Sequence, residues 1–137
     1  MKQAVLLSLA TLFAAVLLCR PAMAGHANGT IIQVPGNERL YYVINGYAAH
    51  IPSPAVMQCL QLGKAGKVMV TQEELNKMPK SSFLVEGGDG KIYRVDGDVK
   101  RHVPNMDVFK KLGFNSSMVL HLPAAMVDCI RTGTPLH

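Results

Sequence analysis

Short apolar runs, each closed by turn-forming residues, set the pattern of the chain after residue 24. Residues 30–34, 40–44 and 47–51 consist mostly of Ile, Val, Tyr and Ala, a composition in which strand-forming residues dominate. The last two runs flank Asn45-Gly46, and this dipeptide favours a type I′ hairpin because both positions accept a positive φ. The pattern therefore predicts three strands, with a tight hairpin between the second and the third.

Two short helices are predicted to follow the hairpin. Ser53 can cap the first helix, and Pro54 suits its first position because an N–H there would have no partner. Gly63 is a suitable stop for this helix. Thr71 begins the second helix, and Glu74 completes a capping box with it. The predicted elements of this half are strands at 30–34, 40–44, 47–51 and 68–70, and helices at 55–62 and 71–78.

The second half of the chain repeats the first. A shift of 52 residues places Tyr41 on Tyr93 and the segment His-Ile-Pro at residue 50 on His-Val-Pro at residue 102. Repetition at such a period indicates one supersecondary unit used twice. In the first helix the register is expected to slip by two, since Leu-Gly occurs at residue 62 and again at residue 112. The predicted elements of this half are strands at 83–85, 91–95, 99–103 and 118–122, helices at 105–111 and 123–131, and a turn at 80–82 before them.

The two halves predict an α+β fold built from two tandem copies of a small unit, each a β-hairpin with helices, over residues 29–80 and 81–133. Neither copy has enough apolar residues to be stable alone, so we expect them to pack as one domain with pseudo-twofold symmetry. The residues expected in one shared core are Leu40, Val43, Ile51, Leu60, Leu62, Leu75, Ile92, Val95, Val103, Phe109, Leu112 and Ile130.

The first 24 residues have the pattern of a secretory signal peptide. A lysine precedes an apolar stretch at 4–18, which is too short to span a bilayer comfortably. Alanines at the −3 and −1 positions predict cleavage before Gly25, which leaves residues 25–137 as one domain without a membrane span. Lipid attachment at Cys19 and retention of the segment as an anchor are alternatives. Export predicts a periplasmic or secreted protein.

Charge adds little to this picture. Removal of residues 1–24 lowers the formal net charge from +5 to +3, a mild excess that suits acidic polymers without requiring them. Basic residues gather at Lys100-Arg101 and Lys110-Lys111, but aromatic residues do not interleave with them as they do in nucleic-acid-binding proteins. No nucleic-acid partner is therefore expected.

Two cysteines remain after the predicted cleavage, Cys59 and Cys129. An even pair in an exported chain predicts a disulfide, and this one would join the two copies through positions that are not equivalent. Closing a loop of about 70 residues is worth on the order of 4 kcal/mol in the chain-entropy model. Two buried free thiols are the alternative.

The repeated pattern resembles a module of bacterial exported, cell-envelope-associated proteins. The similarity rests on Tyr-x-Val, a hairpin turn, His-Ile-Pro-Ser-Pro, a Leu-Gly helix end and Thr-x-x-Glu-Leu-x-x-Met-Pro, and it covers residues 40–133. The chain departs from the pattern at Asn105-Met106, in place of Ser-Pro, and at Ala48-Ala49, in place of Lys-Arg. Such modules are often found in tandem, and sometimes beside peptidoglycan-cleaving or other envelope domains. The resemblance implies no catalytic activity and an accessory role in binding or envelope attachment.

Polar and aromatic residues of the hairpins are the candidate binding residues. His50 and His102 are equivalent, and each either meets a ligand in a groove between the copies or hydrogen-bonds the following turn to fix the His-x-Pro corner. The position of Tyr42 is occupied by Arg94 in the second copy. Because arginine is a charged residue, we expect that face of the strand to be exposed. Exposed tyrosines beside basic residues could stack on a sugar or grip a peptide, and ordinary cross-strand packing is the simpler alternative. The candidate binding residues are Tyr42, Tyr47, His50, Arg94, Lys100, Arg101 and His102.

The sequence contains no constellation typical of catalysis, metal binding or cofactor binding. Serine-hydrolase, zinc-protease and phosphate-loop signatures are missing. His26, His121 and His137 lack the spacing of metal ligands, and the aspartates near residue 96 are expected to form turns. The sequence therefore predicts a non-enzymatic module, without cofactor or metal, that binds an envelope polymer or an exported protein. The alternatives are a small periplasmic inhibitor or immunity-type protein and an unrecognised hydrolase.

Overall fold

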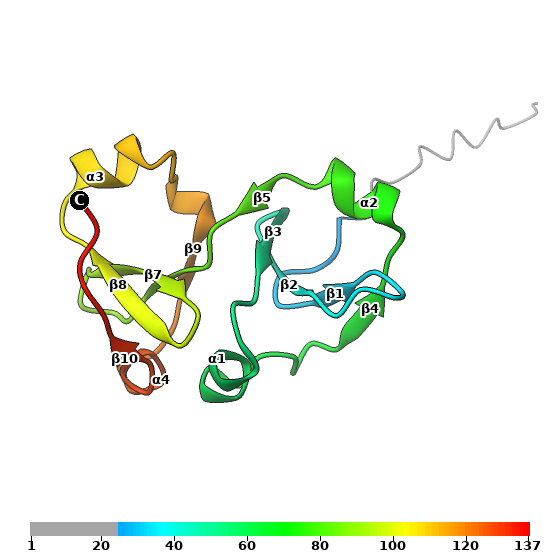
Figure 1. The fold of residues 1–137 in the computed structure, drawn as a ribbon, viewed down its shortest axis with the longest axis horizontal. Helices are drawn as coiled ribbons and strands as arrows, with labels where there is room; N and C mark the ends of the chain where they lie inside the picture. The colour runs from blue at the N-terminus through cyan, green and yellow to red at the C-terminus, as the bar shows by residue number, and fades with distance from the viewer. Residues whose placement is uncertain (1–24) are drawn as a thin grey trace, which may run out of the picture.

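The computed structural model describes residues 25–137, so the predicted signal peptide and Cys19 lie outside the described part. The chain forms two units of short elements, which lie side by side (Figure 1). The first unit contains β1 (Ile31–Gln33), β2 (Leu40–Ile44), β3 (Tyr47–His50), α1 (Pro54–Cys59), β4 (Lys67–Met69), α2 (Gln72–Lys77) and β5 (Lys80–Ser81). The second unit contains β6 (Leu84–Glu86), β7 (Ile92–Asp96), β8 (Val99–Val103), α3 (Met106–Lys111), the 3₁₀ turn η1 (Ser116–Met118), β9 (Val119–His121), α4 (Ala124–Asp128) and β10 (Arg131–Thr132).

Each unit forms one five-stranded sheet, and the two sheets have the same topology. The order is β4-β1-β2-β3-β5 in the first unit and β9-β6-β7-β8-β10 in the second. Antiparallel strands occupy the centre of each sheet, and one parallel strand flanks them on either side. Tyr41 pairs with His50 and Tyr93 with His102, so the repeated motif has the same register in both units. The α+β class and the duplicated unit are confirmed.

Each unit ends in a two-residue strand that the sequence did not predict. β5 pairs in parallel with β3, where the sequence predicts only a turn at 80–82. β10 pairs in parallel with β8, and α4 ends at Asp128, where the sequence predicts a helix to residue 131. Strands of two residues leave no hydrophobic pattern of their own, because they exist only through pairing with the edge of a sheet that has already formed.

The first helices of the two units end in the same way. α1 ends in a Schellman motif, in which the N–H of Leu62 donates to the carbonyl of Met57 at 3.0 Å. α3 ends in the same motif 52 residues further on. The left-handed position is Gln61 (φ 51°) after α1 and Gly113 (φ 75°) after α3. The expected slip of two residues is therefore wrong, because Gln61 is the counterpart of Gly113.

Gln61→Gly is expected to raise the free energy of unfolding by about 0.5–1 kcal/mol, because glycine enters the left-handed region without the Cβ clash that glutamine suffers there. The change can be measured by urea denaturation followed by circular dichroism. Gln58→Gly, within α1, is the matched control and should lower the free energy by about 0.5–1 kcal/mol. Equal losses in both variants would contradict the strained geometry at Gln61.

Buried side chains form three clusters instead of the single core that the sequence predicts. Each sheet has two faces, which we name by the helix that covers them. The central core joins the α1 face of the first unit to the α4 face of the second, and the other two clusters lie under α2 and under α3. The central core contains Ile31, Ile44, Ala49, Ile51, Val56, Leu60, Phe83, Val85, Val95, Val127 and Ile130. The copies therefore share a core, but Val43 and Leu75 belong to the cluster under α2, and Val103 and Phe109 to the cluster under α3.

The two units meet through unlike faces. Twofold symmetry would bring equivalent helices together, as α1 with α3 or α2 with α4. Figure 1 shows α1 beside α4 at the lower edge of the view, with α2 and α3 at opposite upper ends. The relation is head-to-tail, as in tandem-repeat proteins, and differs from the expected pseudo-twofold packing. Sequence equivalence between the copies cannot distinguish twofold from head-to-tail packing, because it does not say which face of each sheet packs on the other unit.

Charged residues lie on the two outer faces of this head-to-tail pair, away from the contact between the units. On the α3 face, the carboxylate of Asp96 lies 2.7 Å from Arg94 and 3.6 Å from Arg101. The residues of the first unit that are equivalent to these three are apolar or aromatic, and they pack in the central core. On α2, Glu74 and Lys77 occupy the positions that Met126 and Cys129 occupy in and after α4. The replacements on the α3 face are Tyr42 by Arg94, Ile44 by Asp96 and Ala49 by Arg101. Polar outer faces are what the terminal units of a repeat array need to remain in contact with water.

Candidate functional site

Each unit carries a pocket at the same place, between the end of its hairpin and the start of its first helix. The first pocket has a volume of about 230 Å³ and the second of about 400 Å³. The repeat shift of 52 residues relates their linings, so the two pockets are copies of one site. The equivalent lining residues are Arg39 and Lys91, Leu40 and Ile92, His50 and His102, Ile51 and Val103, Ser53 and Asn105, Pro54 and Met106, and Met57 and Phe109.

The same local rules position the histidine in both pockets. His50 ends β3 and His102 lies near the end of β8, each opposite a tyrosine of the neighbouring strand. The imidazole packs against that tyrosine, with ring centroids 5.6 Å apart for Tyr41 and 5.5 Å apart for Tyr93. A proline two residues later cannot donate to a ladder and ends the strand, which leaves the imidazole at the mouth of the pocket.

Both imidazoles are free to meet a ligand. Among residues 25–137, the side-chain hydrogen bonds found in the turns after the two histidines are made by Ser53 and Asn105, which accept from the N–H groups of Val56 and Val108, and not by the imidazoles that the sequence suggested. Burial, followed by the positive charge of Arg39, lowers the pKa of His50, which keeps its ring neutral at pH 7. A neutral imidazole offers one donor and one acceptor.

Each pocket also carries a cation and a carboxylate that the sequence analysis did not single out. Glu38 and Arg39 line the first pocket, and Asp89 and Lys91 line the second. All four residues are exposed to solvent. The repeat shift itself pairs Arg39 with Lys91, so a comparison of every equivalent position would have found the cations.

The predicted binding tyrosines lie outside both pockets. Tyr42 is half-buried against the central core, where its ring meets Phe83 edge-on at 6.1 Å, and burial raises the pKa of its hydroxyl. The expectation that its strand face is exposed is wrong, because this face packs on the second unit. The hydroxyl of Tyr47 accepts a hydrogen bond from Nδ2 of Asn115 at 2.9 Å, which links the β2–β3 hairpin to the second unit.

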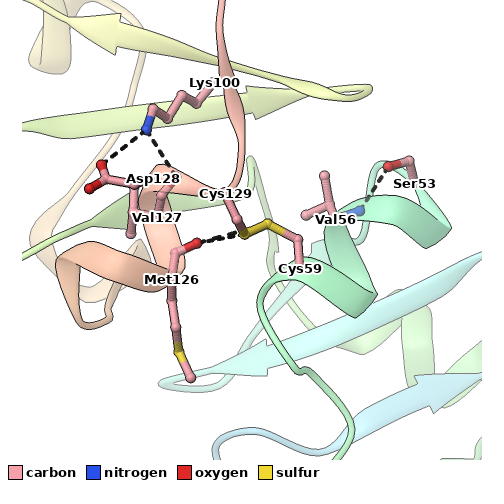
Figure 2. The surroundings of a disulfide bond; sticks show 8 residues. All are labelled: Ser53, Val56, Cys59, Lys100, Met126, Val127, Asp128 and Cys129. Carbon is pink, nitrogen blue, oxygen red and sulfur yellow. Dashed lines mark hydrogen bonds and ion pairs between the residues drawn. A yellow bond between two sulfur atoms is a disulfide. The ribbon is translucent and has the colours of Figure 1, made fainter.

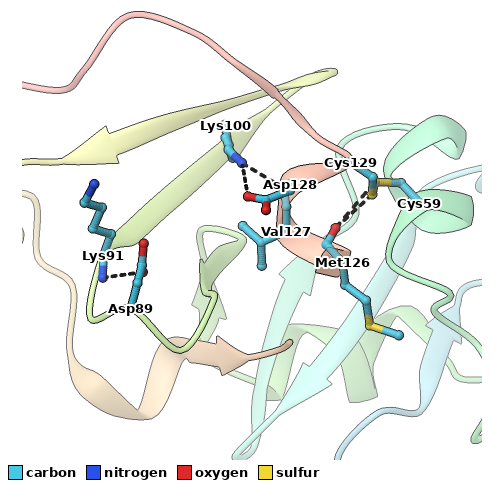
Figure 3. A network of polar contacts seen from close by, with 8 residues as sticks. All are labelled: Cys59, Asp89, Lys91, Lys100, Met126, Val127, Asp128 and Cys129. Carbon is cyan, nitrogen blue, oxygen red and sulfur yellow. Dashed lines mark hydrogen bonds and ion pairs between the residues drawn. A yellow bond between two sulfur atoms is a disulfide. The ribbon is translucent and has the colours of Figure 1, made fainter. Parts of the chain in front are cut away.

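Three predicted basic residues are engaged within the second unit. Arg94 and Arg101 bind the carboxylate of Asp96. The ammonium of Lys100 is buried, donates to the carbonyl of Val127 at 2.9 Å and lies 3.7 Å from the carboxylate of Asp128 (Figure 3). Lys100 therefore holds α4 against the sheet. The seven predicted residues do not form one cluster, and only His50 and His102 line the repeated pockets.

A disulfide between Cys59 and Cys129 joins α1 to the end of α4 (Figure 2). Their Cα atoms are 6.0 Å apart, within the range that a disulfide spans. The predicted bond is confirmed. It connects the two units at the edge of the central core.

A third hollow of about 260 Å³ lies between the units. Its polar groups already bind one another: the side chain of Asn28 accepts from the N–H of Asn45 at 2.7 Å, and Nδ1 of His121 lies 2.8 Å from the carboxylate of Glu86. The pKa of Glu86 is lowered by the bond from His121 and then by the N–H of Gly90. This hollow leaves fewer free polar groups for a ligand than the two repeated pockets do.

Neither a metal site nor a spanning helix is found in the described part of the chain. Within residues 25–137 no three His, Cys, Asp or Glu side chains gather closely enough to hold a metal ion. None of the helices in this range has the length and apolar character needed to cross a bilayer. Comparison with family models, with curated proteins and with solved structures finds no match to the chain.

Proposed function

We propose that the protein is an exported, non-enzymatic binding module that attaches to a component of the bacterial cell envelope through its two repeated pockets. The observation that carries this proposal is that both copies keep an imidazole, a cation and an apolar floor at the same pocket. The apolar and aromatic positions through which the first unit meets the second, by contrast, are charged on the outer face of the second unit. Because packing between the copies does not require the imidazole and the cation, their presence in both copies favours a role in binding.

Two further features support export and attachment. A disulfide persists in oxidising compartments such as the periplasm and is rare in the cytosol, and Cys59–Cys129 joins the two units. The resemblance of the repeat to envelope-associated modules points the same way.

Binding to purified cell-wall sacculi tests the proposal. The protein should sediment with sacculi, and the double variant Arg39→Gln/Lys91→Gln should lose most of this binding because each pocket loses its cation. Lys110→Gln/Lys111→Gln removes the same charge from an exposed part of α3 outside both pockets and should bind normally. Retention of the wild type no greater than that of an unrelated protein of net charge +3 would refute wall attachment.

An exposed strand edge favours a second candidate function, the inhibition of an exported enzyme. β4 is the outer strand of the first sheet, and its Val68 and Met69 are 40% and 51% exposed. Open edges of this kind accept an extended segment of another protein. Co-purification of a periplasmic enzyme that Met69→Lys abolishes, with sacculus binding absent, would favour this function over wall attachment.

A further inference from the structure

The two repeated pockets share an arrangement of unlike charges that suits one class of ligand. Neither Glu38 with Arg39 nor Asp89 with Lys91 forms an ion pair within 4.0 Å, and none of the four pairs with another charged side chain of residues 25–137. The carboxylate of Asp89 accepts one hydrogen bond, from the backbone N–H of Lys91 at 2.9 Å (Figure 3). The Lys91 ammonium and the Arg39 guanidinium thus remain available at the rims.

The floor of each pocket is apolar. Ile51 and Val103 are each 6% exposed, and Phe109 is 4% exposed. Leu40 and Ile92 complete the floors as partly buried residues. A ligand that fills these pockets must combine an apolar stem with polar groups at one end, because the charges stand only at the rim.

We propose that each pocket binds an aliphatic α-amino carboxylate, either a free amino acid or the amino-acid end of a longer aliphatic stem. This rests on the proposed function, in which the repeated pockets are the binding sites. The ligand carboxylate pairs with Arg39 or Lys91, and its ammonium pairs with Glu38 or Asp89. The imidazole takes one further hydrogen bond, and the stem covers the apolar floor.

Charge complementarity selects this class over its neighbours. Beside its imidazole, each pocket holds one basic and one acidic side chain. A ligand with a carboxylate alone is attracted by the cation of the pocket but repelled by the carboxylate of the pocket. A ligand with an ammonium alone is attracted by that carboxylate but repelled by the cation. A ligand with both charges satisfies both groups. The second pocket has the larger volume, so it accepts the longer stem.

A titration with leucine and its three blocked derivatives tests the inference. N-Acetylleucine keeps only the carboxylate, leucinamide keeps only the ammonium, and N-acetylleucinamide keeps neither charge. The Cε1–H signals of His50 and His102, assigned with His50→Gln and His102→Gln, are followed by NMR at constant pH and ionic strength. We expect saturable shifts of both signals with leucine, and affinities about three- to fivefold weaker for the singly blocked forms, the size of one exposed charge contact.

Pocket variants separate the contributions of the two charges. Arg39→Gln should weaken leucine binding about three- to fivefold at His50 and leave it unchanged at His102, and Lys91→Gln should do the reverse. Glu38→Gln should weaken leucine at the first pocket without weakening N-acetylleucine. Equal affinity for leucine and N-acetylleucine, or no saturable shift with any of the four compounds, would overturn the inference. Sacculus binding in the same preparation would then leave the proposed function standing, because the two measurements fail independently.

Discussion

Reduction of the Cys59–Cys129 disulfide is expected to lower the midpoint of thermal unfolding by roughly 10–20 °C. The bond closes a loop of 70 residues, and in the chain-entropy model a loop of that length contributes about 4 kcal/mol. A loss of that size is a large share of the stability of a small domain. The measurement is thermal denaturation, with and without a thiol reductant, of the protein freed of its first 24 residues.

Cysteine variants provide the control for this result. Cys59→Ala, Cys129→Ala and the double variant should unfold at similar temperatures, and the reductant should not change any of them. The wild type should gain the mass of two hydrogens on reduction, and the variants should gain none. A wild-type midpoint that does not respond to complete reduction would show that the bond contributes nothing to stability.

Ile44→Asp is expected to lower the free energy of unfolding by about 4 kcal/mol or more. Ile44 is 4% exposed in the central core between the units, so the variant loses apolar burial and places a carboxylate without a partner in that core. The equivalent residue of the second unit is already an aspartate, Asp96, which is partly exposed and paired with Arg94 at 2.7 Å. The substitution therefore places in the first unit the residue type that the second unit has at the equivalent position.

Val68→Asp is the matched control for Ile44→Asp. It makes a similar change at a residue of β4 that is 40% exposed, and it should change the free energy of unfolding by less than about 1 kcal/mol. Urea denaturation of both variants measures the difference. Similar losses at the two positions would mean that the units do not meet through unlike faces as described.

Local features of the fold followed from the sequence because neighbouring residues produce them. The hairpin at Asn45-Gly46 depends on the turn residues themselves, and Asn45 has the positive φ that the turn requires. The capping box of Thr71 and Glu74 is present at the start of α2. Asn105 caps α3 as Ser53 caps α1, so the departure from Ser-Pro in the second copy preserves the local geometry.

The candidate site could be predicted only in part. The repeat identified His50 and His102 as equivalent, but their surroundings depend on which side chains the folded chain brings to the end of the hairpin. Arg39 reaches the first pocket from the loop before β2, and no local pattern indicates that loop as a lining segment. Tyr42 and Lys100, by contrast, have the composition of binding residues and are used for packing.

The sequence by itself determined the repeat, the class of the fold, the strands of the hairpins and the cysteine pair, because periodicity, turn chemistry and cysteine number are properties of the chain. Tertiary structure alone decided the two-residue strands β5 and β10, which need a neighbouring sheet edge to exist. It also decided that α1 meets α4 and that like positions have unlike roles in the two units. Strand alternation assigns side chains to two faces, but only the packing of one unit on the other determines which of those faces is buried.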